Sequence, residues 1–177
     1  MLKLDVPNLS TKRLSLEPLS FDHSQGMFSL WSDEFVIKYS GTVADIKGNT
    51  IEMPAKTSDQ SDLIIDFWLE AINKGWGFRW AVHLKENQKA FVGTVGFNSL
   101  EEEYELAFHL IPKFWGKGIM TEASKSAVEW AARNGAKTIV AFIEDENQSS
   151  IELARRLGLV ATSELSSGAR KYKLSLL

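Results

Sequence analysis

The stretch YELAFHLIPKFWGKGIMTEA, residues 104–123, runs from an apolar segment through two glycines into a helical pattern. Residues 104–111 are typical of a strand, and the apolar periodicity from Ile119 to about Asn134 predicts a helix. Residues 138–144, TIVAFIE, then predict a buried strand. A strand–helix–strand unit of this kind is normally a right-handed parallel crossover. The presence of this unit therefore predicts a mixed sheet rather than a purely antiparallel one.

The glycines Gly116 and Gly118 lie directly before the predicted helix. A helix N-terminus offers unpaired N–H groups and a partial positive charge, and glycine lets a ligand approach the backbone closely. With Lys113 and Lys117 nearby, the segment predicts a site for a phosphate or pyrophosphate. The same glycines would also serve a plain strand-to-helix turn, so spacing alone leaves both interpretations open.

Two familiar phosphate motifs do not match this segment. A Walker loop needs Gly, four residues and then Gly-Lys-Ser/Thr, which does not occur here. A dinucleotide fingerprint would need glycine where Thr121 stands. A doubly wound fold also needs several successive crossovers, whereas the N-terminal half predicts hairpins. These observations disfavour a dinucleotide site.

The remaining segments predict an α+β fold with a mixed, mostly antiparallel sheet and one parallel crossover. No composition shift divides the chain, so we expect a single domain over residues 1–177. The predicted elements are strands at 13–19, 78–84 and 90–97 with a polar turn at 85–89, helices at 20–33, 62–75 and 147–158, a long loop at 40–62, and a last hairpin turned at Ser166–Gly168.

Composition excludes several classes of function. A net charge of −3 argues against broad binding to nucleic acid or anionic membranes. The absence of Cys excludes disulfides, zinc–thiolate sites and cysteine nucleophiles. No apolar run reaches the roughly 18 to 20 residues of a membrane span, and the start lacks the apolar core of a signal peptide. We therefore expect a soluble cytoplasmic protein. The three histidines lack metal-ligand spacing, so no metal is expected, and no Gly-x-Ser-x-Gly elbow supports a serine hydrolase.

The segment PKFWGKGIMTEA, residues 112–123, resembles the acetyl-CoA loop of the GNAT superfamily of N-acetyltransferases, Gln/Arg-x-x-Gly-x-Gly/Ala before a helix. WGKG followed by TEA is most similar to the ribosomal-protein-alanine and -serine (Rim-type) branch. TKRLSLEPLSFDH, residues 11–23, is similar to that branch's first strand and turn. Its second signature is similar to NQSSIELARRLGL, through Asn147, Ser150, Arg156, Gly158 and Leu159.

The chain departs from the family pattern at two positions. Lys113 replaces the usual Gln or Arg, which keeps charge but loses planar hydrogen bonding, and Leu159 replaces an aromatic residue. The resemblance implies a three-layer α/β/α fold, with acetyl-CoA as co-substrate and no metal. The cofactor-binding residues that it implies are His109, Leu110, Ile111, Lys113, Phe114, Trp115, Gly116, Lys117, Gly118, Ile119, Thr121, Asn147 and Arg156.

The resemblance also implies roles for these residues. The amides of 114–119 would hold the pyrophosphate, with a hydroxyl added by Thr121, and the strand edge at 109–111 would pair with pantetheine. Asn147 would hydrogen-bond pantetheine, and Arg156 would reach a CoA phosphate. Each has a plainer alternative, since Asn147 is also a good helix cap and Arg156 an ordinary solvated residue.

The chemistry of amine acetylation requires a base. An attacking amine must be neutral, yet an α-amino group has a pKa of about 7.7 to 8.0 and lysine about 10.4. Members of the branch often carry Glu on the central strand, which implies Glu105, and strand alternation places His109 on the same face. The alternatives are that Glu105 ends a solvated run and that His109 is a core histidine. Ser150 would hand a proton to the departing thiolate, or would be only a first-turn hydroxyl.

The acceptor side lies within residues 31–80 if the resemblance holds. Trp31, Trp76, Trp80 and Arg79 would line an acceptor cleft, or else belong to the core. Relatives in the branch acetylate protein N-termini, polyamines or amine antibiotics. We expect a monomeric or homodimeric N-acetyltransferase that works by direct attack in a ternary complex, with a protein N-terminus favoured. The alternatives are a small-molecule amine acceptor, or a CoA-binding sensor or partner-binding module without turnover.

Overall fold

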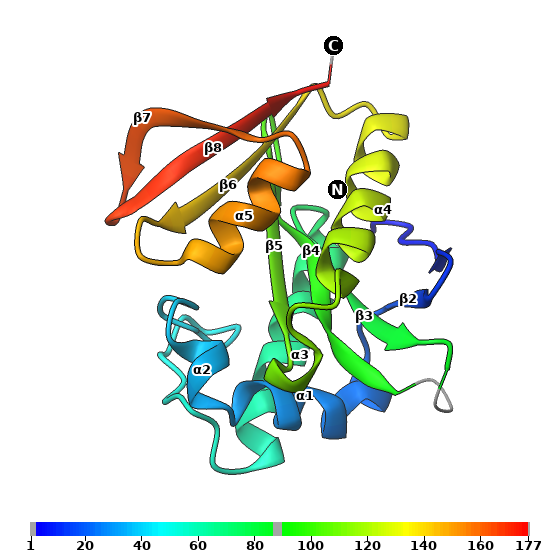
Figure 1. Ribbon diagram of the computed structural model, residues 1–177. Helices are drawn as coiled ribbons and strands as arrows, with labels where there is room; N and C mark the ends of the chain where they lie inside the picture. Colours follow the sequence, from blue (N-terminus) through cyan, green and yellow to red (C-terminus); the bar gives the residue numbers. More distant parts are fainter. Residues whose placement is uncertain (1–2, 87–89, 177) are drawn as a thin grey trace.

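The computed structural model describes residues 3–86 and 90–176. Its sheet has eight strands in the order β1-β2-β3-β4-β5-β6-β8-β7 (Figure 1). All neighbouring strands are antiparallel except β5 and β6. The strands are β1 Leu9–Ser10, β2 Leu14–Pro18, β3 Phe78–Leu84, β4 Phe91–Leu100, β5 Tyr104–Leu110, β6 Thr138–Glu144, β7 Val160–Ser166 and β8 Ala169–Ser175. The helices are η1 Phe21–His23, α1 Ser24–Trp31, α2 Glu34–Ile37, α3 Ser58–Lys74, η2 Pro112–Phe114, α4 Ile119–Arg133 and α5 Gln148–Arg156.

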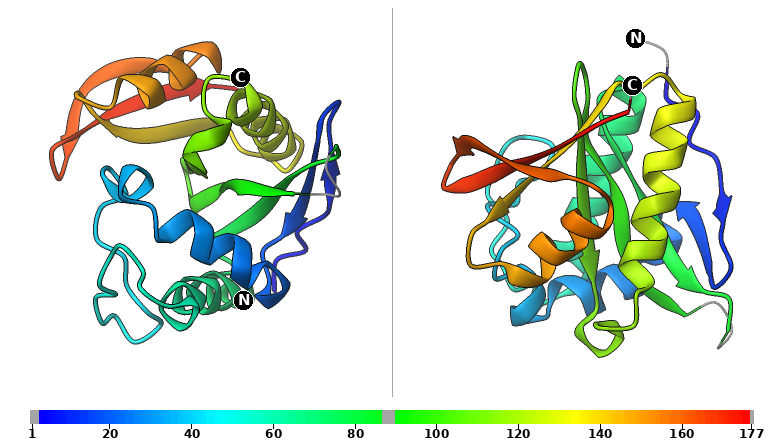
Figure 2. Two further views of the ribbon diagram at one scale, coloured as in Figure 1. Left: turned by 60° about the horizontal axis from the view of Figure 1, so that its bottom comes forward. Right: turned by 45° about the horizontal axis from the view of Figure 1, so that its top comes forward.

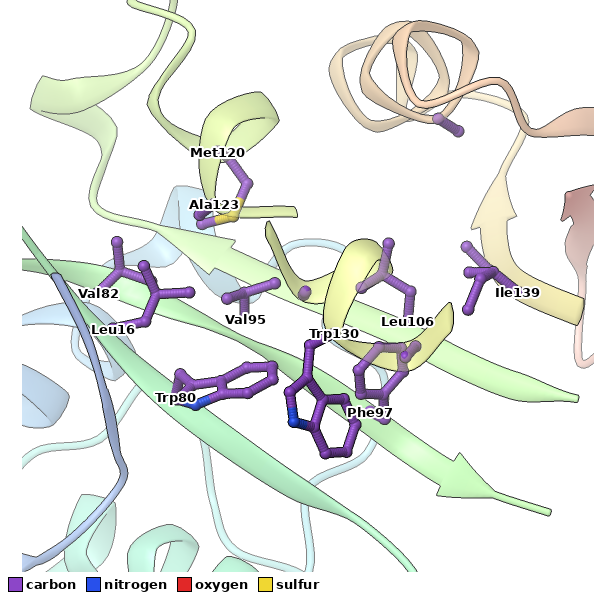
Figure 3. Close-up of a cluster of buried hydrophobic side chains, with 14 of the residues drawn as sticks. Leu16, Trp80, Val82, Val95, Phe97, Leu106, Met120, Ala123, Trp130 and Ile139 are labelled. Atoms are coloured by element: carbon purple, nitrogen blue, oxygen red, sulfur yellow. The ribbon is translucent and has the colours of Figure 1, made fainter. Parts of the chain in front are cut away.

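Helices cover both faces of the sheet, which confirms the predicted three layers. Helices α4 and α5 lie on one face, and α1 and α3 lie on the other (Figure 2). The first face buries the larger cluster, in which Trp130 of α4 packs among Trp80, Phe97 and Leu106 (Figure 3). Such aromatic clusters supply much of the energy of a core, because each ring buries a large apolar area.

Strand alternation in β3 separates the two faces. Phe78, Trp80 and Val82 point to the α4 side, where Trp80 is fully buried and meets the Trp130 ring edge-on at 5.4 Å between centroids. Arg79 and Ala81 point to the α1 and α3 side, since neighbouring residues of a strand face opposite ways. Alternate residues of this one strand thus pack against two different helical layers.

The crossover unit behaves as its sequence predicts. β5 and β6 run parallel but pair only at Tyr104↔Ile139 and Glu105↔Val140. Beyond these pairs β5 continues with β4, and β6 continues with β8 to Glu144↔Ala169. The two strands therefore splay apart toward their C-terminal ends, as Figure 1 shows. The splay leaves one edge of β5 without a strand partner over its second half.

Several predicted boundaries change in detail. α3 begins at Ser58 rather than 62, because Thr57 and Gln60 form a capping box. The segment 20–33 divides into η1 and α1, since Ser20 caps a short 3-10 turn first. The last hairpin and its turn are confirmed, and part of the predicted turn at 85–89 lies outside the described residues. Among the described helices, none has the length and apolarity needed to cross a membrane.

Candidate active site

A cavity of about 880 Å³ occupies the splay between β5 and β6 and continues to the opposite layer. One side is formed by the glycine loop and the N-terminal turns of α4 and α5, and the other by α1, α3 and the segment after α2. The predicted site residues that line it are Glu105, His109, Leu110, Phe114, Trp115, Gly116, Gly118, Ile119, Thr121, Asn147, Ser150 and Arg156. Three predicted residues, Ile111, Lys113 and Lys117, lie outside the lining.

A row of free backbone amides opens α4. The N–H groups of Phe114 and Trp115 already donate within the η2 turn, to carbonyls at 3.0 Å. The first helical hydrogen bond of α4 joins the Glu122 N–H to the Gly118 carbonyl at 3.1 Å. Between them, the amides of residues 116–121 donate to no group in the part of the chain that the structure describes. The free row thus begins two residues later than the predicted 114–119.

The two loop glycines adopt the left-handed conformation that this turn needs. Gly116 has φ 72° and Gly118 has φ 71°. Gly118 is also the residue before the first turn of α4 and has no side chain to cap it. The exposed amides therefore remain available to a ligand, and the positive end of the α4 dipole reinforces them.

Asn147 and Ser150 open α5 on the other side of the splay. The Asn147 Oδ1 accepts hydrogen bonds from the Ser150 N–H at 3.3 Å and the Ser149 hydroxyl at 3.2 Å. Asn147 therefore caps α5, which was the alternative to a role in binding pantetheine. Its Nδ2, however, donates to no described group. The half-buried Ser150 hydroxyl lines the cavity without a described partner. Both side chains keep a polar group for a ligand.

Cationic side chains gather near the cavity mouth. Arg156 lines the cavity, and its Nε donates to Glu152 Oε1 at 3.1 Å. The Lys113 and Lys117 ammonium groups lie 5.0 and 5.7 Å from the Phe114 ring centroid. These exposed charges favour the approach of an anionic ligand.

Glu105 belongs to a hydrogen-bonded chain that sequence analysis did not find. The Asn98 Nδ2 donates to Glu105 Oε1 at 2.6 Å, and the Arg79 guanidinium donates to Asn98 Oδ1. Asn98 reaches both because β4 has a bulge between Phe97 and Ser99. No residue type in that segment predicts the bulge, so the contact between Asn98 and Glu105 could not be predicted from the sequence. Glu105 is half-buried in the cavity wall rather than the end of a solvated run.

Arg79 is the buried, positively charged member of this hydrogen-bonded chain. Its guanidinium stacks 3.6 Å from the Trp68 ring centroid, and only 4% of the residue is exposed. Burial lowers the pKa of Arg79 to about 9, with the negative Glu105 acting in the opposite direction. Arg79 therefore stays charged at neutral pH, on the same hydrogen-bonded chain as Glu105.

His109 lies on the same face of β5 as Glu105, as predicted. Its ring contacts Trp31 of α1, with 4.8 Å between centroids. Burial, and secondarily the charge of Arg79, lowers the pKa of His109 to about 3. A histidine that is neutral throughout the physiological range binds protons too weakly to be the preferred base.

The structure divides the four residues expected on the acceptor side. Trp31, Trp76 and Arg79 line the cavity. Trp80 does not, and its core alternative holds: it points to the opposite face of the sheet and is fully buried in the core. The physical reason is alternation, because Trp80 follows Arg79 directly in β3.

The fold brings His23 and His83 together with Glu17, although their linear spacing suggested no cluster. Ligand atoms of the three lie within 4.8 Å of one another. The His23 Nδ1 accepts a hydrogen bond from the Ser20 N–H at 3.0 Å, so Nε2, which faces Glu17 at 3.7 Å, carries the proton. A metal ligand needs that nitrogen free and the other one protonated. The observed hydrogen bonding therefore does not fit a metal site here.

Comparison with known proteins adds three findings. The family model described as "Acetyltransferase (GNAT) domain" matches residues 13–160. The chain is 28% identical over 158 residues to "Uncharacterized N-acetyltransferase p20" of Bacillus licheniformis, covering 86% of this chain and 82% of the relative. Solved structures under 25% identity share the fold. They include RimL, a ribosomal alpha-N-protein acetyltransferase in complex with coenzyme A, with a TM-score of 0.75 at 17% identity and coverage of 96% and 98%. Another is spermidine N-acetyltransferase from Vibrio cholerae in complex with CoA and spermine, with a TM-score of 0.72 at 15% identity and coverage of 94% and 97%.

Proposed function

The chain belongs to the GNAT family of acetyltransferases, and from this premise we propose that it acetylates the α-amino group of a protein N-terminus, using acetyl-CoA. The observation that carries the proposal is the row of free amides at residues 116–121, which faces the same cavity as Glu105. One side of this cavity suits an anionic cofactor, and the other presents a carboxylate to an amine.

The residues of the first side fit acetyl-CoA. The amides of residues 116–121 bind the pyrophosphate, with the hydroxyl of Thr121 beside them. The unpartnered edge of β5 pairs with the amides of pantetheine as an added strand would. Asn147 Nδ2 donates to the same arm, and Arg156 meets a phosphate at the mouth.

The chemistry is a direct acyl transfer in a ternary complex. Glu105, held by Asn98, takes a proton from the incoming ammonium, directly or through a water. The neutral nitrogen attacks the thioester carbonyl, the C–N bond forms and the C–S bond breaks. The Ser150 hydroxyl supplies a proton to the departing thiolate and regains one from the attacking nitrogen, directly or through a water, so that the nitrogen becomes a neutral amide. No covalent enzyme intermediate is required.

A protein N-terminus is the favoured acceptor for two reasons. The motifs at residues 112–123 and 147–159 resemble the Rim-type branch, and RimL is a fold relative that acts on a protein α-amino group. An α-amino group also loses its proton more readily than a polyamine nitrogen or lysine. The spermidine enzyme shares the fold at a similar level, so a polyamine acceptor is the second candidate. A single domain, a cytoplasmic location and a monomeric or homodimeric state remain predictions.

The test is CoA release from acetyl-CoA across a panel of acceptors. Because the chain has no Cys, a thiol reagent detects only released CoA. The panel holds peptides beginning with Ser, Ala and Met, their N-acetylated counterparts as matched controls, spermidine and an aminoglycoside. We expect turnover with free peptide N-termini and none with the blocked peptides. Turnover with spermidine alone would show that the acceptor is a polyamine rather than a protein N-terminus. CoA binding without turnover on any acceptor would favour the non-catalytic module.

A further inference from the structure

A hydrogen-bonded network joins the start of β2 to the first turn of α4, beside the glycine loop. Glu122 Oε1 accepts from the Thr11 hydroxyl at 2.6 Å and from the Arg13 N–H at 2.8 Å, while Oε2 accepts from Arg13 Nε at 2.6 Å. The same guanidinium donates through Nη1 to the carbonyl of Lys117 at 2.8 Å. Arg13 therefore links a carboxylate on the helix to a carbonyl in the loop.

The bond to Lys117 determines the direction of a neighbouring amide. In a planar trans peptide the C=O and N–H point opposite ways. The Lys117 carbonyl and the Gly118 N–H share one peptide group, so a carbonyl that points to Arg13 turns the N–H away from Arg13. Gly118 lines the cavity, whereas Arg13, Lys117 and Glu122 do not. The network thus lies outside the cavity while it orients an amide at the cavity wall.

This loop needs such support because of its glycines. Gly118 has φ 71°, and glycine adopts either sign of φ at similar cost. Rotation of the peptide would turn the Lys117 carbonyl oxygen toward the place of the phosphates, where its partial negative charge would repel them. A bond that fixes one orientation before the ligand arrives reduces the cost of ordering on binding.

Arg13 also balances the charge of Glu122. An acidic residue in the first turn stabilises a helix but repels an anion at the same terminus. Burial raises the pKa of Glu122, and the hydrogen bonds from Thr11 and Arg13 outweigh this, so its pKa lies below the ordinary value. The carboxylate stays ionised at neutral pH, and its charged partner is the Arg13 guanidinium.

We propose that Arg13 is a positioning residue that holds the peptide between Lys117 and Gly118 in the orientation that binds the pyrophosphate of acetyl-CoA. This inference rests on the proposed function. Arg13 itself does not line the cavity and acts on the cofactor only through the loop.

The experiment compares Arg13→Met with Arg133→Met, a control at an exposed site in the last turn of the same helix α4. Calorimetry measures binding of CoA, and steady-state kinetics compares acetyl-CoA with S-acetylpantetheine, which lacks the pyrophosphate. For Arg13→Met we expect a Kd for CoA and a KM for acetyl-CoA about tenfold higher. We expect kcat, and kcat/KM for S-acetylpantetheine, to stay within about twofold of the unsubstituted protein. In Arg133→Met all of these constants, and the Kd for CoA, should stay within the same range.

Two further variants separate positioning from charge and from folding. Arg13→Lys keeps the charge but lacks the fork that spans two partners, so we expect it to bind CoA as weakly as Arg13→Met. Full recovery by lysine would overturn the positioning role. Glu122→Ala removes both oxygens that hold Arg13 and should weaken CoA binding, because the loss of loop order outweighs the removed repulsion of the anion. This variant tests the proposal even if Arg13→Met fails to fold.

The remaining outcomes are also decisive. An equal loss with acetyl-CoA and S-acetylpantetheine, or an unchanged Kd for CoA, would overturn the inference. An unsubstituted protein that binds no CoA would instead contradict the proposed function, which the calorimetry reveals before any variant is compared.

Discussion

Glu105, the proposed base, is positioned by two residues on other strands, Asn98 of β4 and Arg79 of β3. Asn98 holds one carboxylate oxygen at 2.6 Å, and the buried Arg79 holds Asn98 in turn. This leaves Oε2 of Glu105 without a hydrogen bond to the part of the chain that the structure describes. His109, four residues along the same strand, is neutral because burial lowers its pKa to about 3. At the scale of single residues, the environment therefore selects the carboxylate over the imidazole.

The substitution Glu105→Gln tests this selection. It keeps the hydrogen bond from Asn98 but removes the base, so we expect kcat to fall about 100-fold or more with the Kd for CoA unchanged. His109→Gln, the matched change on the same face, should lower kcat by much less. Steady-state kinetics with the preferred acceptor, together with calorimetry for CoA, measures both. A larger kcat loss in His109→Gln would reverse the assignment.

The element that we propose as the cofactor-binding loop is the turn between η2 and α4, and its glycine can be compared with a second glycine at the other end of α4. Gly116 at φ 72° precedes the helix, and Gly135 at φ 88° follows it. An added Cβ would meet no atom within 4 Å at either position. Both positions therefore impose similar backbone strain on any other residue, but only Gly116 lines the cavity.

Gly116→Ala and Gly135→Ala consequently form a matched pair. Each should lower the free energy of unfolding by about 1–2 kcal/mol, the cost of the left-handed conformation for a residue with a Cβ. Only Gly116→Ala should also weaken CoA binding, by about tenfold, because its methyl group occupies the approach to the amides. Urea unfolding and calorimetry measure the two effects. Equal CoA affinity in both variants would show that the loop does not hold the cofactor.

Across the whole molecule, the splay leaves the C-terminal strands β6, β8 and β7 joined to β5 by only two parallel pairs. Ion pairs reinforce this seam. Lys171 of β8 contacts Glu103, in the turn before β5, at 2.6 Å and Glu164 at 3.1 Å, and Lys173 contacts Glu103 at 3.1 Å. Glu103 therefore ties the two halves of the sheet together at the end where β5 and β6 are paired.

Glu103→Gln should lower the free energy of unfolding by up to about 1 kcal/mol at pH 7. Hydrogen bonding from Lys171, partly opposed by burial, lowers the pKa of Glu103 below its ordinary value. A depressed folded-state pKa stabilises above the unfolded-state pKa, and the effect is lost as pH falls through the folded-state value. The difference between the two proteins should therefore hold near neutral pH and shrink below about pH 4.3. Glu70→Gln, in an exposed helical pair with Lys74, is the control, and a pH-independent difference would contradict the assignment.

Much of this architecture could be predicted from local sequence. The parallel crossover, the caps at Asn147 and Gly75 and the final hairpin follow from residue patterns within a few positions. Local sequence was insufficient where a choice depended on distant partners. It left Trp80 between the cleft and the core, because nothing near Trp80 in the sequence indicates which face of β3 meets Trp130. The free amides lie at 116–121 because the η2 turn uses two earlier ones, which spacing could not reveal.

The sequence by itself determined the order of elements and the glycine loop before α4, because these depend on short-range periodicity, capping and backbone freedom. Only the tertiary structure decided which side chains act together. Asn98 reaches Glu105 through a bulge, Arg13 reaches Lys117 from the segment before β2, and His109 loses its basicity by burial. Those contacts join residues up to 104 positions apart, and their energies depend on distance and burial in space rather than on position along the chain.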